Sequence, residues 1–378
     1  MSEREGTVPA VRPASLKEAR AAVLDTAGRI SVAGAGTAAD WAGRLGPVDA
    51  VLDTTGLSGV ITHNPGDMTV SVHAGTPLRA LQEELAGHGQ HVAFDAARVA
   101  DGATVGGLVA TADAGPSALV YGTLRDLVIG ATTLLADGAV VRSGGHVIKN
   151  VAGFDLAKLL HGSYGTLGVL VEVVLRLHPT PRAIGTVVVD CDLADAARLA
   201  REVLASQLEP TALEWLGRGR LLVRIDSTEE ALPARLERLA RLLGDGAAVA
   251  EAEVWAEHAA LTRGVPGSGG RDGTAVLRIG TLPSLLPGVL EALPTSTVTA
   301  GLGTGVATVS VPAGAVAEAH ATVHAAGGTS VLRSRPADSD APAWGPPPSA
   351  LAVLEAVKQR FDPDGRFGPG RFDPWEIS

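Results

Sequence analysis

A glycine-rich loop early in the chain has the residue types and spacing that suit a diphosphate. Residues 34–39, Gly-Ala-Gly-Thr-Ala-Ala, fit the pattern G-x-G-x-x-A, and Asp53 follows Gly34 by nineteen residues. In a Rossmann dinucleotide site, such glycines admit the pyrophosphate and the acidic residue binds the ribose. Residues 40–47, however, leave little room for the long helix that a Rossmann unit needs next. An NAD-binding Rossmann dehydrogenase and a plain tight turn both stay open as alternatives.

A second group of glycines follows further along the chain. Residues 104–107, Thr-Val-Gly-Gly, open a turn into the small-residue stretch 108–114, and two more motifs occupy 149–156 and 162–169. Glycines at such positions let backbone amides approach an anionic or planar ligand without a Cβ in the way. The apolar strand expected from Val169 can offer backbone N–H and C=O groups to a ring system.

Two arginines interrupt apolar strands in the second half of the chain. Arg224 lies within Leu-Leu-Val-Arg-Ile at 221–225, and Arg278 within Ala-Val-Leu-Arg-Ile at 275–279. A charge in an apolar strand is costly unless it is paired, and arginine suits bidentate binding of a carboxylate. Both are therefore candidates for holding a substrate carboxylate. The alternative is that each points to solvent.

Metal and thiol chemistry find little support. The single cysteine, Cys191, excludes a disulfide within the chain and any multi-cysteine iron–sulfur or zinc site, and its neighbouring aspartates disfavour a thiolate. His320 and His324 share a helix face without an acidic third ligand, so we expect a solvated helix and no metal site. We interpret His146, in a run Arg-Ser-Gly-Gly-His, as a surface or core histidine.

The order of the predicted strands and helices that position these residues changes after residue 181. Before it we expect a strand at 30–33, a hairpin at 127–142 that turns at Asp137-Gly138, and an apolar strand at 169–177. After it the order β-α-β-β-α-β is expected at about 184–190, 194–206, 211–216, 220–226, 229–243 and 247–255, and a second set spans 274–332. This repeated order predicts an antiparallel sheet covered by helices. A proline-rich linker, a helix at 349–360 and an aromatic tail follow.

Composition sets outer limits on the function. A length of 378 residues suits two domains, and a net charge of −10 argues against a nucleic-acid partner. No run of 18 apolar residues occurs, so we expect no membrane-spanning segment, and the charged start at 1–5 is unlike a secretory signal. With one cysteine, a cytoplasmic location is expected.

Together these motifs resemble the vanillyl-alcohol oxidase and p-cresol methylhydroxylase superfamily of FAD proteins, and within it the FAD-binding subunit of glycolate oxidase. The motifs at 149–156 and 162–169 carry the resemblance, and so does the tail, Lys358-x-x-Phe361-Asp362-Pro363 followed by Pro369-Gly370-Arg371. The likeness is strong over about 100–181 and in the tail.

The resemblance implies an α+β fold in three parts. These are a two-subdomain FAD-binding domain of the p-cresol methylhydroxylase type at 1–181, an antiparallel α+β cap at 182–340, and a helix and tail at 341–378 that return to the FAD-binding domain. It implies non-covalent FAD, since the loop at 32–37 offers no histidine, cysteine or tyrosine for attachment. The implied cofactor-binding residues are Ala33, Gly34, Ala35, Gly36, Thr37, Thr104, Gly106, Gly107, Gly115, Val169 and Val171, with Asp53 only a strand-end residue.

The same resemblance implies an oxidoreductase that acts on the CH–OH group of a small 2-hydroxy acid. It would work with a second flavoprotein subunit and an iron–sulfur subunit, and would be peripheral to the membrane only through them. The metal-binding motif His-x-Gly-Asp-Gly-Asn-x-His of D-2-hydroxy-acid dehydrogenases does not occur in the sequence. This favours a partner subunit over a stand-alone dehydrogenase, although both stay open.

Overall fold

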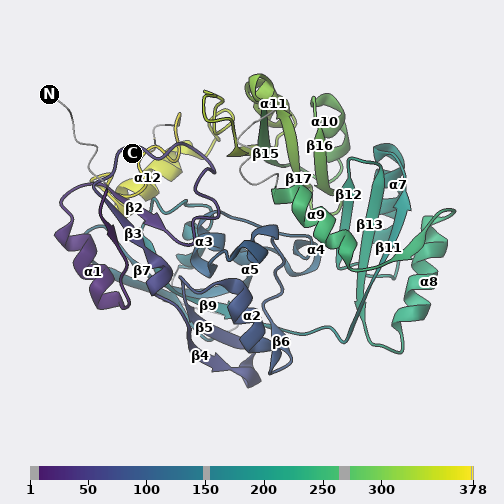
Figure 1. The fold of residues 1–378 in the computed structure, drawn as a ribbon, viewed down its shortest axis with the longest axis horizontal. Coiled ribbons are helices and arrows are strands. Elements are labelled where there is room, and N and C mark those ends of the chain that lie inside the picture. The colour runs from purple at the N-terminus through teal and green to yellow at the C-terminus, as the bar shows by residue number, and fades with distance from the viewer. Residues whose placement is uncertain (1–7, 148–153, 264–272, 376, 378) are drawn as a thin grey trace.

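The computed structural model describes residues 8–147, 154–263, 273–375 and 377. Two sequence features lie outside them: the charged start at 1–5 and residues 149–153 of one predicted motif. The described chain forms two lobes that face each other (Figure 1), one from the first half of the chain and its tail, the other from the strands of 183–334. Helices and mainly antiparallel sheets agree with the predicted α+β class.

A three-stranded parallel sheet positions the first glycine loop. Its strands, in spatial order, are β1 (Ala10–Val11), β3 (Ala50–Asp53) and β2 (Ile30–Ala33). Helix α1 (Leu16–Asp25) packs beside this sheet and begins where Ser15 Oγ accepts a hydrogen bond from the backbone N–H of Glu18 (3.2 Å). Strand β2 ends at Ala33, so the chain turns into the glycine loop at the carboxyl end of the strand.

A five-stranded antiparallel sheet forms the rest of the first lobe. Its strands, in spatial order, are β4 (Val60–Asn64), β5 (Thr69–His73), β9 (Val169–Arg176), β7 (Val128–Leu134) and β8 (Val140–Gly144). The hairpin that turns at Asp137-Gly138 is confirmed as β7 and β8. A two-stranded ladder pairs β6 (Gln90–His91) with β10 (His178–Pro179). The helices of this lobe are α2 (Leu78–Ala86), α3 (Val105–Ala110), α4 (Ala118–Tyr121), α5 (Leu124–Leu127) and α6 (Ala157–Leu160).

The second lobe, which we call the cap, is one eight-stranded antiparallel sheet built from two copies of the expected β-α-β-β-α-β order. The strands, in spatial order, are β14 (Ala248–Ala250), β11 (Ala183–Asp190), β13 (Arg220–Ser227), β12 (Ala212–Leu216), β16 (Thr297–Gly301), β17 (Val306–Pro312), β15 (Thr274–Gly280) and β18 (Thr329–Ser334). Strands β12 and β16 pair at the centre and join the two copies. The domain boundaries at 181 and 340 stay a prediction.

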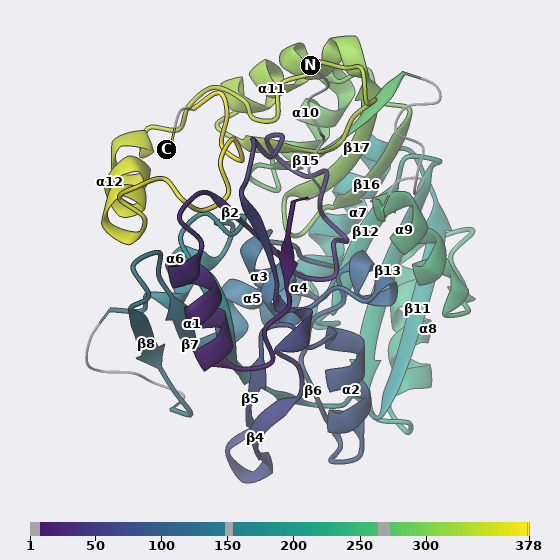
Figure 2. The same ribbon diagram turned by 60° about the vertical axis from the view of Figure 1, so that its left-hand side comes forward.

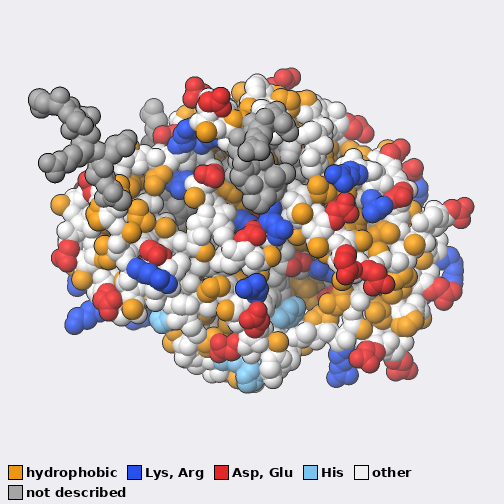
Figure 3. Space-filling model, viewed as in Figure 1, with side chains coloured by type: hydrophobic (Ala, Val, Ile, Leu, Met, Phe, Trp, Pro, Cys, Tyr) orange, Lys and Arg blue, Asp and Glu red, His pale blue; other side chains and the backbone are white. Residues whose placement is uncertain are grey.

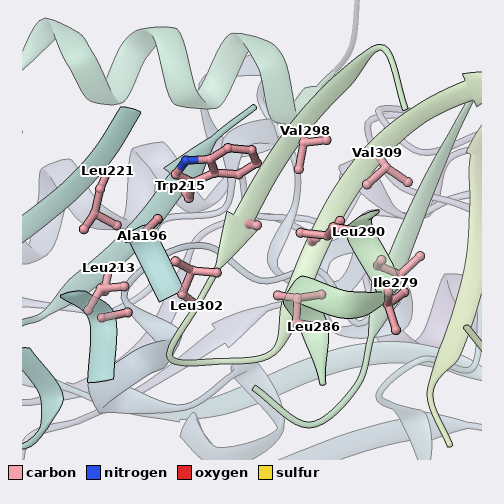
Figure 4. Packing of buried hydrophobic residues seen from close by; sticks show 14 of the residues in the cluster. Ala196, Leu213, Trp215, Leu221, Ile279, Leu286, Leu290, Val298, Leu302 and Val309 are labelled. Atoms are coloured by element: carbon pink, nitrogen blue, oxygen red, sulfur yellow. The ribbon is translucent and has the colours of Figure 1, made fainter. Parts of the chain in front are cut away.

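Alternation along the cap strands separates an apolar face from a polar one. The apolar face packs under α7 (Leu193–Leu204), α8 (Leu232–Leu243), α10 (Leu286–Ala292) and α11 (Val316–Ala325). Figure 4 shows Trp215 and Leu221 of the first copy in the same core as Ile279 and Val298 of the second. Because side chains alternate between the two faces of a strand, Glu214, Arg224 and Arg278 lie on the opposite, polar face. None of the helices described is long and apolar enough to cross a membrane.

The end of the first copy differs from the expected strand at 247–255. Strand β14 is only three residues long, and Glu253–Arg263 form helix α9. Helix α9 contacts β16 and the short 3-10 helix Ala97–Asp101 of the first lobe, so it lies between the two lobes (Figure 1). The short apolar run before α9 has no hydrophobic periodicity that would distinguish a strand from a helix, which is why the sequence predicted a strand there.

The tail packs onto the first lobe through a buried lysine. Lys358 of α12 (Leu351–Phe361) is 2% exposed, and its Nζ donates to Asp362 Oδ2 (2.6 Å), Thr166 O (3.0 Å) and Phe367 O (3.1 Å). Further along the tail, the backbone carbonyl of Arg366 accepts a hydrogen bond from the backbone N–H of Ile30 (2.7 Å), which fixes the tail against β2. Figure 2 shows α12 on the outside of the first lobe.

We expect Lys358→Met to destabilise the protein by about 3–5 kcal/mol, because the variant leaves the Asp362 carboxylate buried without its counter-charge. Urea unfolding followed by circular dichroism measures the change. Lys17→Met removes an exposed helix lysine and is the matched control, for which we expect a change within about 0.5 kcal/mol. Equal effects of the two substitutions would show that the buried pair does not hold the tail.

Candidate functional site

The first glycine loop and the second glycine block face each other across one cleft. The cleft has a volume of about 230 Å³. Of the residues predicted to bind a cofactor, it is lined by Ala33, Gly34, Ala35, Gly36, Thr37, Thr104, Gly106 and Gly107. Ser163, Tyr164 and Gly165 of the third motif line it as well. The structure therefore brings together three segments that are far apart in the sequence.

Missing side chains keep the cleft open. A Cβ on Gly34 would lie 2.5 Å from Thr104 Oγ1, which is itself fixed because it accepts a hydrogen bond from the backbone N–H of Gly107 (3.1 Å). A Cβ on Gly106 would lie 2.9 Å from that of Ala74. Gly36 has φ +74°, and nothing lies within 4 Å of where its Cβ would be. Because both loops expose their backbone groups to the same cleft without side chains in the way, the cleft suits a diphosphate.

Three of the predicted cofactor residues are not among those that line this cleft. Gly115 lines a neighbouring cavity. Val169 and Val171 are 0% and 2% exposed and belong to the core, while Gly168 and Leu170 line the cleft beside them. The predicted backbone contact between these valines and a flavin ring stays a prediction.

Asp53 has a local structural role. Its Oδ1 accepts hydrogen bonds from the backbone N–H (2.9 Å) and hydroxyl (2.6 Å) of Thr55, which caps a short 3-10 helix at Thr54–Gly56. The structure shows no helix between β2 and β3, so the strand, loop, helix and strand of a Rossmann unit are not formed. Asp53 is a strand-end residue, as the flavin interpretation expects.

A buried ionic cluster connects the cleft to the cap. Asp113 is 1% exposed and accepts hydrogen bonds from Arg98 Nε (3.0 Å) and Arg333 Nη2 (2.6 Å), and Arg278 Nη1 lies 3.6 Å away. Burial raises the pKa of the Asp113 carboxyl, but the three guanidinium groups lower it by more than burial raises it, to about 2. Burial and the Arg333 charge lower the pKa of Arg278 to about 10, so it keeps its charge at neutral pH. Sequence reasoning found only Arg278 of these four residues.

A second cavity, of about 370 Å³, lies between the polar face of the cap sheet and the first lobe. In the space-filling view the surface is hollowed where the two lobes meet, and charged side chains gather there (Figure 3). Arg224 and Arg278 both line this cavity rather than point to solvent. Arg224 is already paired, since its Nη2 donates to Asp95 Oδ2 (3.1 Å) and its guanidinium lies 5.0 Å from the ring centroid of Trp255.

The cavity also holds a histidine–carboxylate pair that sequence reasoning missed. His258 Nε2 lies 3.1 Å from Glu214 Oε2, and both residues are less than a tenth exposed. The carboxylate in the apolar segment 212–216 was a usable signal, of the same kind as the arginines in apolar strands. His258 gave none, because its helix was expected to begin as a strand.

His146 and His320 each have hydrogen-bond partners of their own. Among the described residues no group of three possible metal-binding side chains comes together. The expectation of a solvated helix is wrong for His320, which is 2% exposed and hydrogen-bonds with Ser330 Oγ (2.5 Å) and Pro342 O (3.1 Å). His146 Nδ1 lies 2.8 Å from Thr69 Oγ1 beside the five-stranded sheet. Burial raises the pKa of the Cys191 thiol, which agrees with an unreactive cysteine.

Comparison with known proteins supports these observations. Residues 9–144 match the model of a family described as FAD binding domain. Glycolate oxidase subunit GlcE of Escherichia coli strain K12 is 34% identical over 190 residues, which make up 50% of this chain and 53% of that protein. Glycolate oxidase subunit GlcD of Bacillus subtilis strain 168 is 36% identical over 144 residues, 38% of this chain and 31% of that protein.

A solved structure of alkyldihydroxyacetonephosphate synthase aligns with a TM-score of 0.67 over 95% of this chain and 76% of that one, at 16% identity, which shows the fold. The match of residues 9–144 to an FAD-binding domain confirms the predicted FAD cofactor, and the aligned structure confirms the predicted fold class. The chain matches about half the length of GlcE and about a third of GlcD.

Gly36 separates the effect of charge from that of backbone strain. We expect Gly36→Asp to weaken FAD binding at least about tenfold more than Gly36→Asn, because the side chains have similar size and tolerance of positive φ but only the carboxylate repels a diphosphate. Fluorescence titration of the flavin-free variants measures both affinities. Equal losses would show that this loop does not contact the diphosphate.

Proposed function

We propose that this chain is an FAD-dependent oxidoreductase subunit that acts on the CH–OH group of a small 2-hydroxy acid. The observation that carries the proposal is the cleft between two glycine loops, within a segment that matches an FAD-binding domain. The similarity to two proteins named as glycolate oxidase subunits supports the substrate class. The chain spans only part of each relative, so their activity is carried over here as a proposal.

The residues of the cleft fit FAD. In the proposal, the loop Ala33–Thr37 and the facing residues Thr104, Gly106 and Gly107 hold the diphosphate through backbone groups, because side chains are missing where the two loops approach. Bound FAD would supply the oxidising group for the alcohol carbon. The protein's part is to bind and orient both molecules and to keep water away.

The substrate carboxylate is assigned to Arg278 rather than to Arg224. Arg224 already has Asp95 and Thr211 as partners. Arg278 shares the Asp113 carboxylate with two other arginines and lies farther from it than they do. A further carboxylate would therefore reduce like-charge repulsion at Arg278. The residue also borders the cavity of about 370 Å³, which has room for a 2-hydroxy acid.

A complex with a second flavoprotein subunit and an iron–sulfur subunit is the favoured setting. The chain has one cysteine, so its own residues cannot hold a cysteine-ligated cluster to pass on single electrons. Both relatives named above are called subunits. A stand-alone dehydrogenase remains the second candidate, and the buried His258–Glu214 pair in the cavity is the observation that favours it.

We expect Arg278→Gln to weaken binding of glyoxylate, the 2-oxo acid related to glycolate, by about 30-fold or more, because a buried charge-assisted contact is lost. Calorimetric titration of the FAD-loaded chain measures the affinity, and the bound flavin absorbance confirms that the cofactor stays. Arg238→Gln, at an exposed position of the cap, is the control. Unchanged affinity in Arg278→Gln would remove this residue from the substrate site.

A steady-state assay tests the heteromeric setting. With glycolate or D-lactate and an artificial dye acceptor, we expect the isolated chain to turn over slowly, because in this setting the partner subunits complete the catalytic site, and added partner subunits to restore the rate. Glycolate and D-lactate should be tested separately, with FAD content measured in each preparation. Rapid turnover by the homogeneous chain, unchanged by partners, would establish the stand-alone dehydrogenase instead.

A further inference from the structure

The ionic cluster around Asp113 carries more positive than negative charge. Three guanidinium groups, those of Arg98, Arg278 and Arg333, surround one carboxylate, so its net charge is three minus one, or +2. Arg98, Arg333 and Asp113 are all at most 5% exposed. Buried charges of one sign are costly unless a counter-ion meets them. The surplus of positive charge therefore favours an anion beside the cluster.

One buried donor of the cluster has no partner in the part of the chain that the structure describes. Arg333 Nη2 donates to Asp113, but its Nε is buried and has no hydrogen-bond partner among the described residues. A buried guanidinium N–H normally finds an acceptor, since an unpaired one costs about 1–3 kcal/mol. The Trp41 ring lies over the Arg333 guanidinium, with its centroid 3.7 Å from Cζ. The ring has no oxygen atom that could accept the Nε–H hydrogen bond.

The cluster lies next to the FAD cleft. A pocket of about 170 Å³ is lined by Gly36–Trp41, by Arg98, Asp113 and Arg333, and by Asp101 and Arg263, which pair with each other (3.7 Å); it shares Gly36–Ala39 and Arg98 with the cleft. Arg98 Nη1 donates to Thr37 Oγ1 (2.9 Å), so the cluster touches the loop assigned to the diphosphate. Arg333 reaches the same pocket from β18, the last strand of the cap.

From this geometry we infer that Arg98 and Arg333 bind the diphosphate of FAD, so that a cap residue completes the cofactor site of the other lobe. The inference rests on the proposed binding of FAD in the cleft. A diphosphate brings negative charge to Arg98 and Arg333 and supplies acceptor oxygens for the Arg333 Nε–H, while Arg278 stays available for the substrate carboxylate. Bound FAD then fixes β18 of the cap to the first lobe.

The test compares three ligands on the flavin-free chain: FAD, ADP and riboflavin. In Arg333→Gln we expect the affinities for FAD and ADP to fall about 10- to 100-fold, as for the loss of a charged hydrogen bond, and the affinity for riboflavin to stay the same. Arg333→Lys should recover part of the loss, since it keeps the charge but not the planar fork. Arg218→Gln, exposed on the same cap, is the control.

Hydrogen exchange provides a second readout. FAD should slow amide exchange in β18 and β15 of the wild-type chain, and much less in Arg333→Gln. Full FAD affinity in Arg333→Gln, loss of riboflavin binding alone, or equal losses for ADP and riboflavin would each overturn the inference. Failure of the wild-type chain to bind FAD at all would instead contradict the proposed function.

Discussion

The relation between the two lobes depends on one buried carboxylate. Asp113 belongs to the lobe with the glycine cleft, while two of its three arginines come from cap strands β15 and β18. Without its negative charge, three guanidinium groups would be buried beside one another, which costs several kcal/mol. Arg98 and Arg333 both stack on Trp41, at 4.0 and 3.7 Å, so the same cluster also positions the loop that follows β2. Cap docking and the shape of the cofactor cleft are therefore coupled.

Local patterns predicted much of the fold and part of the site. The repeated β-α-β-β-α-β order was visible because strand and helix periods alternate along the cap, and the glycine loops were visible because their backbone positions exclude side chains. Gly34 and Gly106 lie where a Cβ would collide with the facing loop. The charged residues in apolar strands were a sound signal as well, since Arg278 lies on the polar face of the sheet.

The rest of the site depends on contacts that leave no local pattern. Arg333 meets Asp113 across 220 residues of chain, and neither residue stands out from its own neighbours. His258 was missed because the short apolar run before α9 fits a strand as well as a helix. Val169 and Val171 fall on the core side of β9 because alternation turns Leu170 toward the cleft. Which face of a strand meets a ligand is set by tertiary packing, which no single segment encodes.

The two copies of the cap repeat differ in how their charges are balanced, and this separates their roles. In the first copy, Arg224 is paired with Asp95 and Glu214 with His258, so these polar groups are satisfied within the protein. In the second copy, Arg278 and Arg333 share one carboxylate with Arg98. A satisfied network needs no ligand and can hold two lobes together, whereas a buried surplus of positive charge favours the binding of an anion. The first copy therefore suits docking alone, and the second suits both docking and ligand binding, although both present the same polar face of one sheet to the other lobe.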